Sequence, residues 1–163
     1  MYARPMSVIA LRAIEDGDLD ALYEQQRDPI AVNMAAFTPD RPDDRAAFDA
    51  HMARVRSAPD VTMRAVTRDG ALVGSVASFV MEGQTEVTYW IDRSAWGGGV
   101  ATGALMLLLE LVTVRPIYAR AASDNVGSLR VLSRAGFSVT GTEWSYANAR
   151  GTEIEETLLR KDA

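Results

Sequence analysis

The stretch Trp96-Gly97-Gly98-Gly99-Val100-Ala101-Thr102 follows a strand-like run at residues 87–91 and leads into an apolar helical run at residues 104–114. Glycines let a backbone approach an anion closely, and the first turn of a helix offers unpaired N–H groups at the positive end of its dipole. This order of elements predicts a binding site for a phosphate group. The alternative interpretation is a flexible loop or a strand-ending turn, which glycines also favour.

Two common phosphate-binding motifs do not fit this loop. No lysine follows the glycines to reach terminal phosphates, which excludes a P-loop. Gly97 and Gly99 match the first two glycines of the dinucleotide motif G-x-G-x-x-G, but Thr102 stands at the third. An early strand–helix–strand unit, which that motif requires, is also missing.

The composition is that of a globular chain and argues against several classes of function. With 163 residues, 48% hydrophobic and 24% charged, the sequence predicts a single domain, residues 1–163. It has no cysteine and one histidine, His51, so we expect neither a thiolate nucleophile nor a metal site. The net charge of −5 argues against nucleic-acid binding and suits a cationic substrate such as an amine.

The sequence also bears on location and assembly. Glu110 interrupts the longest apolar run, residues 105–114, which is too short for a membrane span, and the N-terminus lacks the apolar core of a signal peptide. We therefore expect a cytoplasmic protein with no membrane partner. An exposed edge at the last strands is compatible with a homodimer.

The order of elements predicts an α/β fold with a mixed, mostly antiparallel sheet and helices on both faces. Residues 30–37 are expected to be short and irregular, with a helical turn and a loop, and the helix at 101–114 to be buried because it is apolar nearly all round. A right-handed crossover at the glycine loop makes its two flanking strands parallel. The pattern predicts strands at residues 7–13, 61–68, 71–81, 86–91, 117–121, 138–147 and 152–160, and helices at 19–28, 44–58, 101–114 and 125–135.

Two further motifs lie downstream of the loop, where residues 125–128 read NVGS and residues 134–137 read RAGF. Together with the loop they resemble the GNAT superfamily of N-acetyltransferases. Its loop pattern, Gln/Arg-x-x-Gly-x-Gly/Ala, is met by Gly99 and Ala101. Its downstream pattern, Asn-x-x-Ala/Ser followed by Gly-Phe, is met by Asn125, Ser128, Gly136 and Phe137.

The stretch at residues 89–92, with Trp96 and Thr102, looks most like the ribosomal-protein-alanine N-acetyltransferase subgroup, the RimJ/RimL-like enzymes. The order of elements agrees with the superfamily over nearly the whole chain, which implies the GNAT fold with about seven strands. Two departures matter. Gly98 replaces a frequent basic residue, and Leu132 stands where many members carry the tyrosine that protonates the leaving thiolate.

The resemblance implies acetyl-CoA as co-substrate and no metal. The backbone N–H groups of the loop are expected to hold the pyrophosphate, and the strand before it to pair with the pantetheine arm and polarise the thioester carbonyl. Asn125 maps to a pantetheine contact, although a plain helix N-cap is the alternative. The full set of cofactor-binding residues is Tyr89, Trp90, Ile91, Trp96, Gly97, Gly98, Gly99, Val100, Ala101, Thr102, Asn125 and Ser128.

Two residues are candidates for catalysis. Ser128 maps next to the sulfur and is expected to donate a proton to the thiolate. Glu86 is the positional candidate for a general base acting through water, against the alternative of a solvated charge at a strand end. Glu143 and Glu153 are weaker candidates, and the acidic residues at 153–156 read equally well as an exposed strand face.

The acceptor pocket in this family lies between the first helices and the last hairpin. Candidates to line it are Met34, Phe37, Trp144 and Tyr146, with core packing as the alternative. The function that the resemblance implies is acetyl transfer to a primary amine, either a protein N-terminus or a small molecule. Two alternatives are a non-catalytic acyl-CoA-binding sensor or regulatory module and a cofactor-free structural domain.

Overall fold

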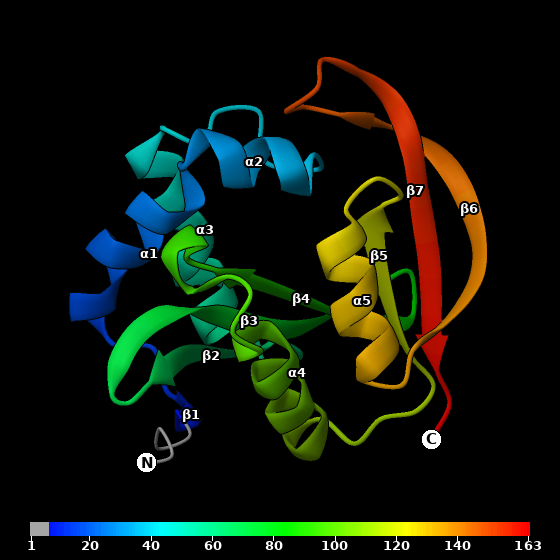
Figure 1. Ribbon diagram of the computed structural model, residues 1–163. Coiled ribbons are helices and arrows are strands. Elements are labelled where there is room, and N and C mark those ends of the chain that lie inside the picture. The colour runs from blue at the N-terminus through cyan, green and yellow to red at the C-terminus, as the bar shows by residue number, and fades with distance from the viewer. Residues whose placement is uncertain (1–6) are drawn as a thin grey trace, which may run out of the picture.

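The structure, a computed structural model, describes residues 7–163 and is built on one seven-stranded sheet (Figure 1). The strands lie in the order β1-β2-β3-β4-β5-β7-β6, and only β4 and β5 are parallel to one another. Their bounds are β1 Ile9–Arg12, β2 Thr62–Arg68, β3 Ala71–Met81, β4 Gln84–Ile91, β5 Ile117–Ala122, β6 Ser138–Ala147 and β7 Thr152–Lys161.

Helices cover both faces of the sheet. Residues of α1 and α3 pack with Ala65 of β2 on one face, and residues of α4 and α5 pack with its neighbour Val66 on the other. The bounds are α1 Leu19–Gln26, α2 Pro29–Ala35, α3 Arg45–Ser57, α4 Val100–Leu111 and α5 Val126–Arg134, with short 3-10 turns η1 Asp16–Asp18 and η2 Arg93–Ala95.

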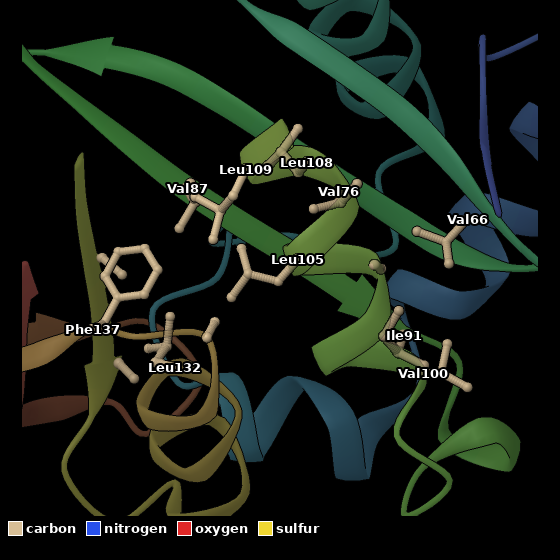
Figure 2. Close-up of a cluster of buried hydrophobic side chains, with 14 of the residues drawn as sticks. Val66, Val76, Val87, Ile91, Val100, Leu105, Leu108, Leu109, Leu132 and Phe137 are labelled. Carbon is tan, nitrogen blue, oxygen red and sulfur yellow. The ribbon is translucent and has the colours of Figure 1, made fainter. Parts of the chain in front are cut away.

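The main hydrophobic core lies between α4, α5 and the sheet (Figure 2). Leu105 and Leu108 of α4 are fully buried there and meet Val76 and Val87 of the central strands. Burial of such side chains contributes about 1.5–3 kcal/mol each to folding. This core fixes α4, and with it the glycine loop, against the sheet.

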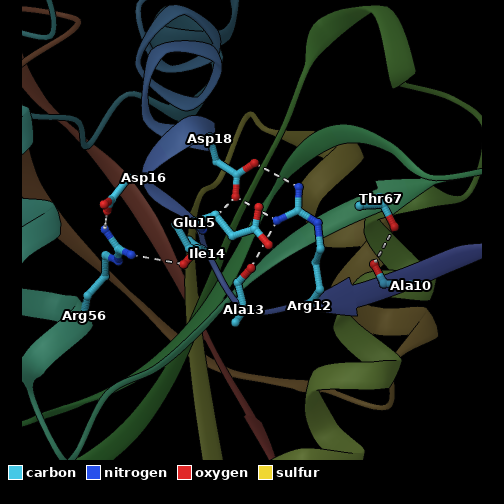
Figure 3. A network of polar contacts seen from close by, with 9 residues as sticks. All are labelled: Ala10, Arg12, Ala13, Ile14, Glu15, Asp16, Asp18, Arg56 and Thr67. Atoms are coloured by element: carbon cyan, nitrogen blue, oxygen red, sulfur yellow. Dashed lines mark hydrogen bonds and ion pairs between the residues drawn. The ribbon is translucent and has the colours of Figure 1, made fainter.

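A polar network anchors the start of α1 (Figure 3). Arg12 of β1 donates two hydrogen bonds to Asp18, at 2.7 and 2.8 Å, and the same carboxylate accepts from the backbone N–H of Glu15. The bonds from Arg12 hold the pKa of Asp18 below its ordinary value. Arg56 of α3 donates to Asp16 and to the carbonyl of Ile14, so that the turn before α1 is tied to both β1 and α3.

The predicted α/β fold with helices on both faces is confirmed, and two local expectations are corrected. Residues 29–35 form a two-turn helix, α2, because Pro29 suits the first position of a helix, where its missing N–H needs no partner. The helix α4 ends at Leu111 and is not buried all round, since Met106 and Leu111 are exposed. The other predicted helices and strands agree with the structure to within a few residues at each end.

Candidate active site at the open edge of β4

The two edges of β4 are paired very differently. Towards β3, all eight of its residues have a partner, from Gln84 opposite Met81 to Ile91 opposite Gly74. Towards β5, the register holds a single pair, Glu86 opposite Tyr118, after which the two strands diverge. We call residues 87–91 on this side the open edge of β4, because no residue of β5 pairs with them.

The glycine loop lies at the end of β4 and opens α4. Gly97 and Gly99 have φ values of 80° and 78°, a left-handed conformation that favours glycine. Gly99 is the N-cap of α4, and no side chain caps that helix end. The N–H groups of its first turn are therefore oriented towards the loop, as an anion site requires. Trp96 is 42% exposed, and its indole N–H donates to the carbonyl of Ile91 at 2.8 Å.

A cation from another strand lies beside this loop. Arg68 is the last residue of β2, and its Nη1 is 3.9 Å from the point that a β-carbon on Gly98 would occupy. Gly98 is the position at which many superfamily members carry a basic residue. Sequence reasoning missed Arg68, because 30 positions separate it from the loop.

Two hydroxyl groups meet between β4 and α5. Tyr89 Oη lies 2.6 Å from Ser128 Oγ and 3.3 Å from the carbonyl oxygen of Ser128. Burial raises the pKa of Tyr89, so the phenol stays protonated at neutral pH. The structure thus brings two predicted residues together, and adds a side-chain partner for Ser128 that the sequence did not indicate.

Asn125 and Leu132 lie near opposite ends of α5. Asn125 is the N-cap, and its Oδ1 accepts from the backbone N–H of Ser128 at 3.2 Å, so the capping interpretation is confirmed. Leu132 is 1% exposed within the main core. An apolar side chain sealed in the core has no part in proton transfer, in agreement with the departure noted in the sequence.

A cluster of charges surrounds Arg120 on the face of the sheet opposite to Tyr89 and Ser128. Arg120 Nε lies 3.3 Å from Glu86, its Nη1 lies 3.4 Å from Glu156, and the same nitrogen hydrogen-bonds Glu143. Glu86 is only 3% exposed, so its interpretation as a solvated charge at a strand end is wrong. Burial raises the pKa of Glu86 and of Glu156, and Arg120 opposes that shift.

The remaining acidic candidates differ in burial. Glu156 is buried, which corrects the expectation of a uniformly exposed acidic strand face, because β7 lies inside the sheet between β5 and β6. Glu153 is exposed and projects away from Arg120, since it is an odd number of positions from Glu156 along the strand.

The four predicted acceptor-lining residues do not form one cluster. Phe37 packs against a small group of buried alanines near Ile154, and Met34 is 38% exposed on α2. Trp144 and Tyr146 are exposed on the face of β6 opposite to Glu143, because side chains alternate along a strand. Contact of any of the four with an acceptor stays a prediction.

The tip of the β6–β7 hairpin is fastened to α2 and to the start of α5. Figure 1 shows the long hairpin reaching over towards the end of α2. Arg150 at this tip donates to the carbonyl of Asn33 at 2.8 Å and makes two hydrogen bonds to Asp124, at 2.8 and 3.1 Å. The ion pair holds the pKa of Asp124 below its ordinary value. Asp124 directly precedes Asn125, so one side chain connects α2 and the hairpin tip with the start of α5.

A family model described as Acetyltransferase (GNAT) domain matches residues 9–138. The chain belongs to this family. It is therefore a GNAT acetyltransferase in fold and family, as the glycine loop and the Asn-x-x-Ser motif predicted. A comparison with curated proteins finds no similar sequence.

Solved structures of GNAT enzymes superpose over almost the whole chain. RimL, a ribosomal L7/L12 alpha-N-protein acetyltransferase in complex with coenzyme A, is 18% identical, with 97% of this chain and 96% of that chain covered and a TM-score of 0.83. Mycobacterium smegmatis RimJ is 23% identical, with 98% and 84% covered and a TM-score of 0.80. Spermidine N-acetyltransferase from Vibrio cholerae, solved with CoA and spermine, is 17% identical, with 93% and 94% covered and a TM-score of 0.80.

Residues 7–163 show neither a membrane-spanning helix nor a metal-binding group. No helix in this range is long and apolar enough to cross a membrane. The same residues hold no group of three or more His, Asp or Glu side chains placed to bind a metal ion.

Proposed function

We propose that this GNAT acetyltransferase uses acetyl-CoA to acetylate a primary amine, by direct attack of the amine on the thioester. The observation that carries the proposal is the open edge of β4. A strand with one fully paired edge and one free edge offers unpaired N–H and C=O groups to an extended ligand such as a pantetheine arm. The left-handed glycines and uncapped helix at its end supply N–H groups for the pyrophosphate.

Arg68 supports this placement of the pyrophosphate. A guanidinium group beside Gly98 restores the cation that the loop itself lacks, and arginine forms strong charge-assisted hydrogen bonds with phosphate oxygens. Arg68 therefore joins the residues of the loop, 96–102, as a proposed cofactor contact.

The two candidate catalytic groups lie on opposite faces of the sheet at the same edge. Glu86 projects towards the face covered by α1, as does Trp90, whose indole donates to a carbonyl of that helix. Ser128 approaches from the face covered by α4 and α5, where Tyr89 contacts it. An amine entering on the Glu86 side would lose its proton through a water to Glu86, while Ser128 donates a hydrogen bond to the leaving sulfur on the other side.

The charges around Glu86 favour a cationic acceptor. Three carboxyl groups, Glu86, Glu143 and Glu156, surround the single guanidinium of Arg120. Such a site attracts a protonated amine and, once the base is ionised, accepts its proton. Both a protein N-terminus and a small polyamine satisfy this chemistry, and both kinds of acceptor are named for structural neighbours of this fold.

The test is acetyl-CoA-dependent release of free thiol with a panel of amines that contains N-terminal peptides, polyamines and an aminoglycoside. Because the chain has no cysteine, the only thiol detected is that of the CoA produced. We expect at least one amine to give turnover that the Glu86→Gln variant reduces. Tight binding of acetyl-CoA without turnover on any amine would instead favour a non-catalytic acyl-CoA-binding module.

A further inference from the structure

We infer that the side chain of Tyr89 is a positioning residue for acetyl transfer: its phenol donates a hydrogen bond to Ser128 Oγ and so directs the serine proton to the leaving sulfur. The inference rests on the proposed function. It goes further by assigning a role to a side chain that the resemblance used only as backbone on the cofactor strand.

The two hydroxyl groups of Tyr89 and Ser128 are closely paired. The distance between Tyr89 Oη and Ser128 Oγ, 2.6 Å, is short for two hydroxyl groups, whereas the phenol is 3.3 Å from the Ser128 carbonyl. That carbonyl lies in the first turn of α5, where the helix itself supplies a donor to it. The serine hydroxyl is therefore the better acceptor for the phenol.

The two hydroxyl groups carry two protons between them, and only one is needed for the bond that joins them. Each hydroxyl has one proton and can also accept. If the phenol proton points to Ser128 Oγ, the serine proton is free to point elsewhere, and the backbone N–H of Ser128 is already directed to Asn125 Oδ1. The sulfur of a pantetheine arm paired with the open edge would then receive the serine proton as a hydrogen bond. Without the phenol, the serine hydroxyl can rotate and nothing fixes its direction.

The phenol of Tyr89 stays protonated in its buried position. Tyr89 lies against the main core, and burial raises its pKa, so it remains a donor over the pH range in which an amine reacts. Leu132, at the position where many superfamily members carry a tyrosine, is buried in the same core. In this chain the tyrosine that influences the sulfur is thus Tyr89 of β4, which acts through Ser128. In many superfamily members the tyrosine stands instead at the position of Leu132 on α5.

The experiment measures the pKa of the CoA thiol bound to the protein, from the ultraviolet absorbance of its thiolate, with the complex of desulfo-CoA subtracted. The protein contributes no thiol of its own. A hydrogen bond donated to a thiolate lowers the pKa of the thiol. We expect that pKa to rise by about one pH unit in Tyr89→Phe and in Ser128→Ala, and no further in the double variant, because one charge-assisted hydrogen bond is lost in each.

Controls separate positioning from packing. Ser128→Thr keeps a hydroxyl and should retain the wild-type thiol pKa. Thr157→Val removes the partner of Ser123 Oγ, a hydroxyl pair of 2.7 Å elsewhere in the fold, and should leave both the thiol pKa and the turnover unchanged. Under turnover, Tyr89→Phe should lower kcat about tenfold with the KM for acetyl-CoA within about twofold.

The outcomes are distinct. If wild type does not bind CoA, the proposed function fails, and the role of Tyr89 with it. If wild type binds CoA and Tyr89→Phe leaves the thiol pKa and kcat unchanged, the role of Tyr89 is wrong while acetyl transfer stands. A thiol pKa that rises in Ser128→Ala but stays at the wild-type value in Tyr89→Phe would likewise overturn the inference.

Discussion

The edge of β4 that faces β3 and the edge that faces β5 belong to the same eight residues, yet they differ in how completely they are paired. The first is paired at every position and is shielded by α4 and the main core. The second is paired only at Glu86, and polar side chains from β4, β5 and α5 gather beside it. The difference shows that one strand can be held rigidly by one neighbour so that its other edge stays available to a ligand.

The paired edge is where substitution should harm the fold most. A β-carbon at Gly74 would lie 2.1 Å from the carbonyl oxygen of Trp90 and 3.0 Å from the Cα of Ile91, so the backbone of β4 would have to move. We expect Gly74→Ala to lower the free energy of unfolding by about 3 kcal/mol, as overpacking of a core does. Urea denaturation measures the loss.

Gly141→Ala is the matched control, because it adds the same methyl group to another strand, where no heavy atom lies within 4 Å of it. Its stability should stay within about 0.5 kcal/mol of wild type. Equal losses in the two variants would mean that the close approach of β3 and β4 is not what requires glycine at position 74.

Substitution of Glu86, beside the open edge, should affect activity more than stability. We expect Glu86→Gln to lower kcat/KM about 100-fold, since it removes the proposed base. Burial raises the pKa of Glu86, so in wild type kcat/KM should fall with decreasing pH already above the ordinary pKa of a glutamate. The variant should lack that part of the acidic limb.

Glu153→Gln is the control for this prediction, because Glu153 is exposed and projects away from Arg120. It should keep kcat/KM within about twofold, as a surface substitution away from the site has little effect. The same raised pKa sets the sign of the effect on folding. Ionisation of Glu86 costs stability, so wild type should lose stability as pH rises from the ordinary carboxyl pKa to the raised one, and Glu86→Gln should lack this contribution.

At the far end of the open edge, Arg68→Ala should weaken acetyl-CoA binding about tenfold, which corresponds to one charge-assisted hydrogen bond. The loss should shrink at high salt, because screening reduces the contribution of the guanidinium in wild type. Calorimetric titration at two ionic strengths checks this. Arg64→Ala, on the same strand, should bind as wild type does, and an equal loss there would refute a specific contact at residue 68.

The smallest effect is expected at the hairpin tip. Arg150→Ala should raise the KM for acetyl-CoA about two- to threefold, because Asp124, which Arg150 holds, precedes Asn125. The pair is partly exposed, so the stability lost should stay under about 1 kcal/mol. The lowered pKa of Asp124 means that this stability is present above the ordinary aspartate pKa and disappears as pH falls through the lowered one.

The control is Arg160→Ala, which removes another exposed Arg–Asp pair, Arg160 with Asp162, far from α5 in the chain. Its kinetics should not change. A KM for acetyl-CoA that is equally raised in both variants would indicate a general charge effect and not a connection through Asp124.

Local chemistry explains why the sequence predicted most of the fold. Asp69 and Gly70 have positive φ and form the expected hairpin turn, and Gly136, with φ of 97°, closes α5 where the sequence placed a helix end. The helix α2 was underestimated because its apolar pattern is too short to show a period. These signals depend only on neighbours along the chain.

The site was predicted less completely, because its contacts join distant parts of the chain. Arg120 meets Glu86, 34 positions away, and Tyr89 meets Ser128, 39 positions away. The motifs indicated Ser128 and the glycine loop by their position in the family. They did not indicate Arg68, Arg120 or Arg150, whose partners are set by strand order and register.

The most direct test of the account is a calorimetric titration of acetyl-CoA into wild type and into Gly98→Glu. Gly98 lies in the loop and does not have a positive φ, and a β-carbon added there meets no atom closer than 3.9 Å. The variant should therefore fold with an unchanged Tm. Its carboxylate places a negative charge at the proposed pyrophosphate site. We predict that wild type binds acetyl-CoA and that Gly98→Glu binds it at least about tenfold more weakly. Equal binding to both proteins, or no binding to wild type, would contradict the assignment of the open edge and its glycine loop to the cofactor.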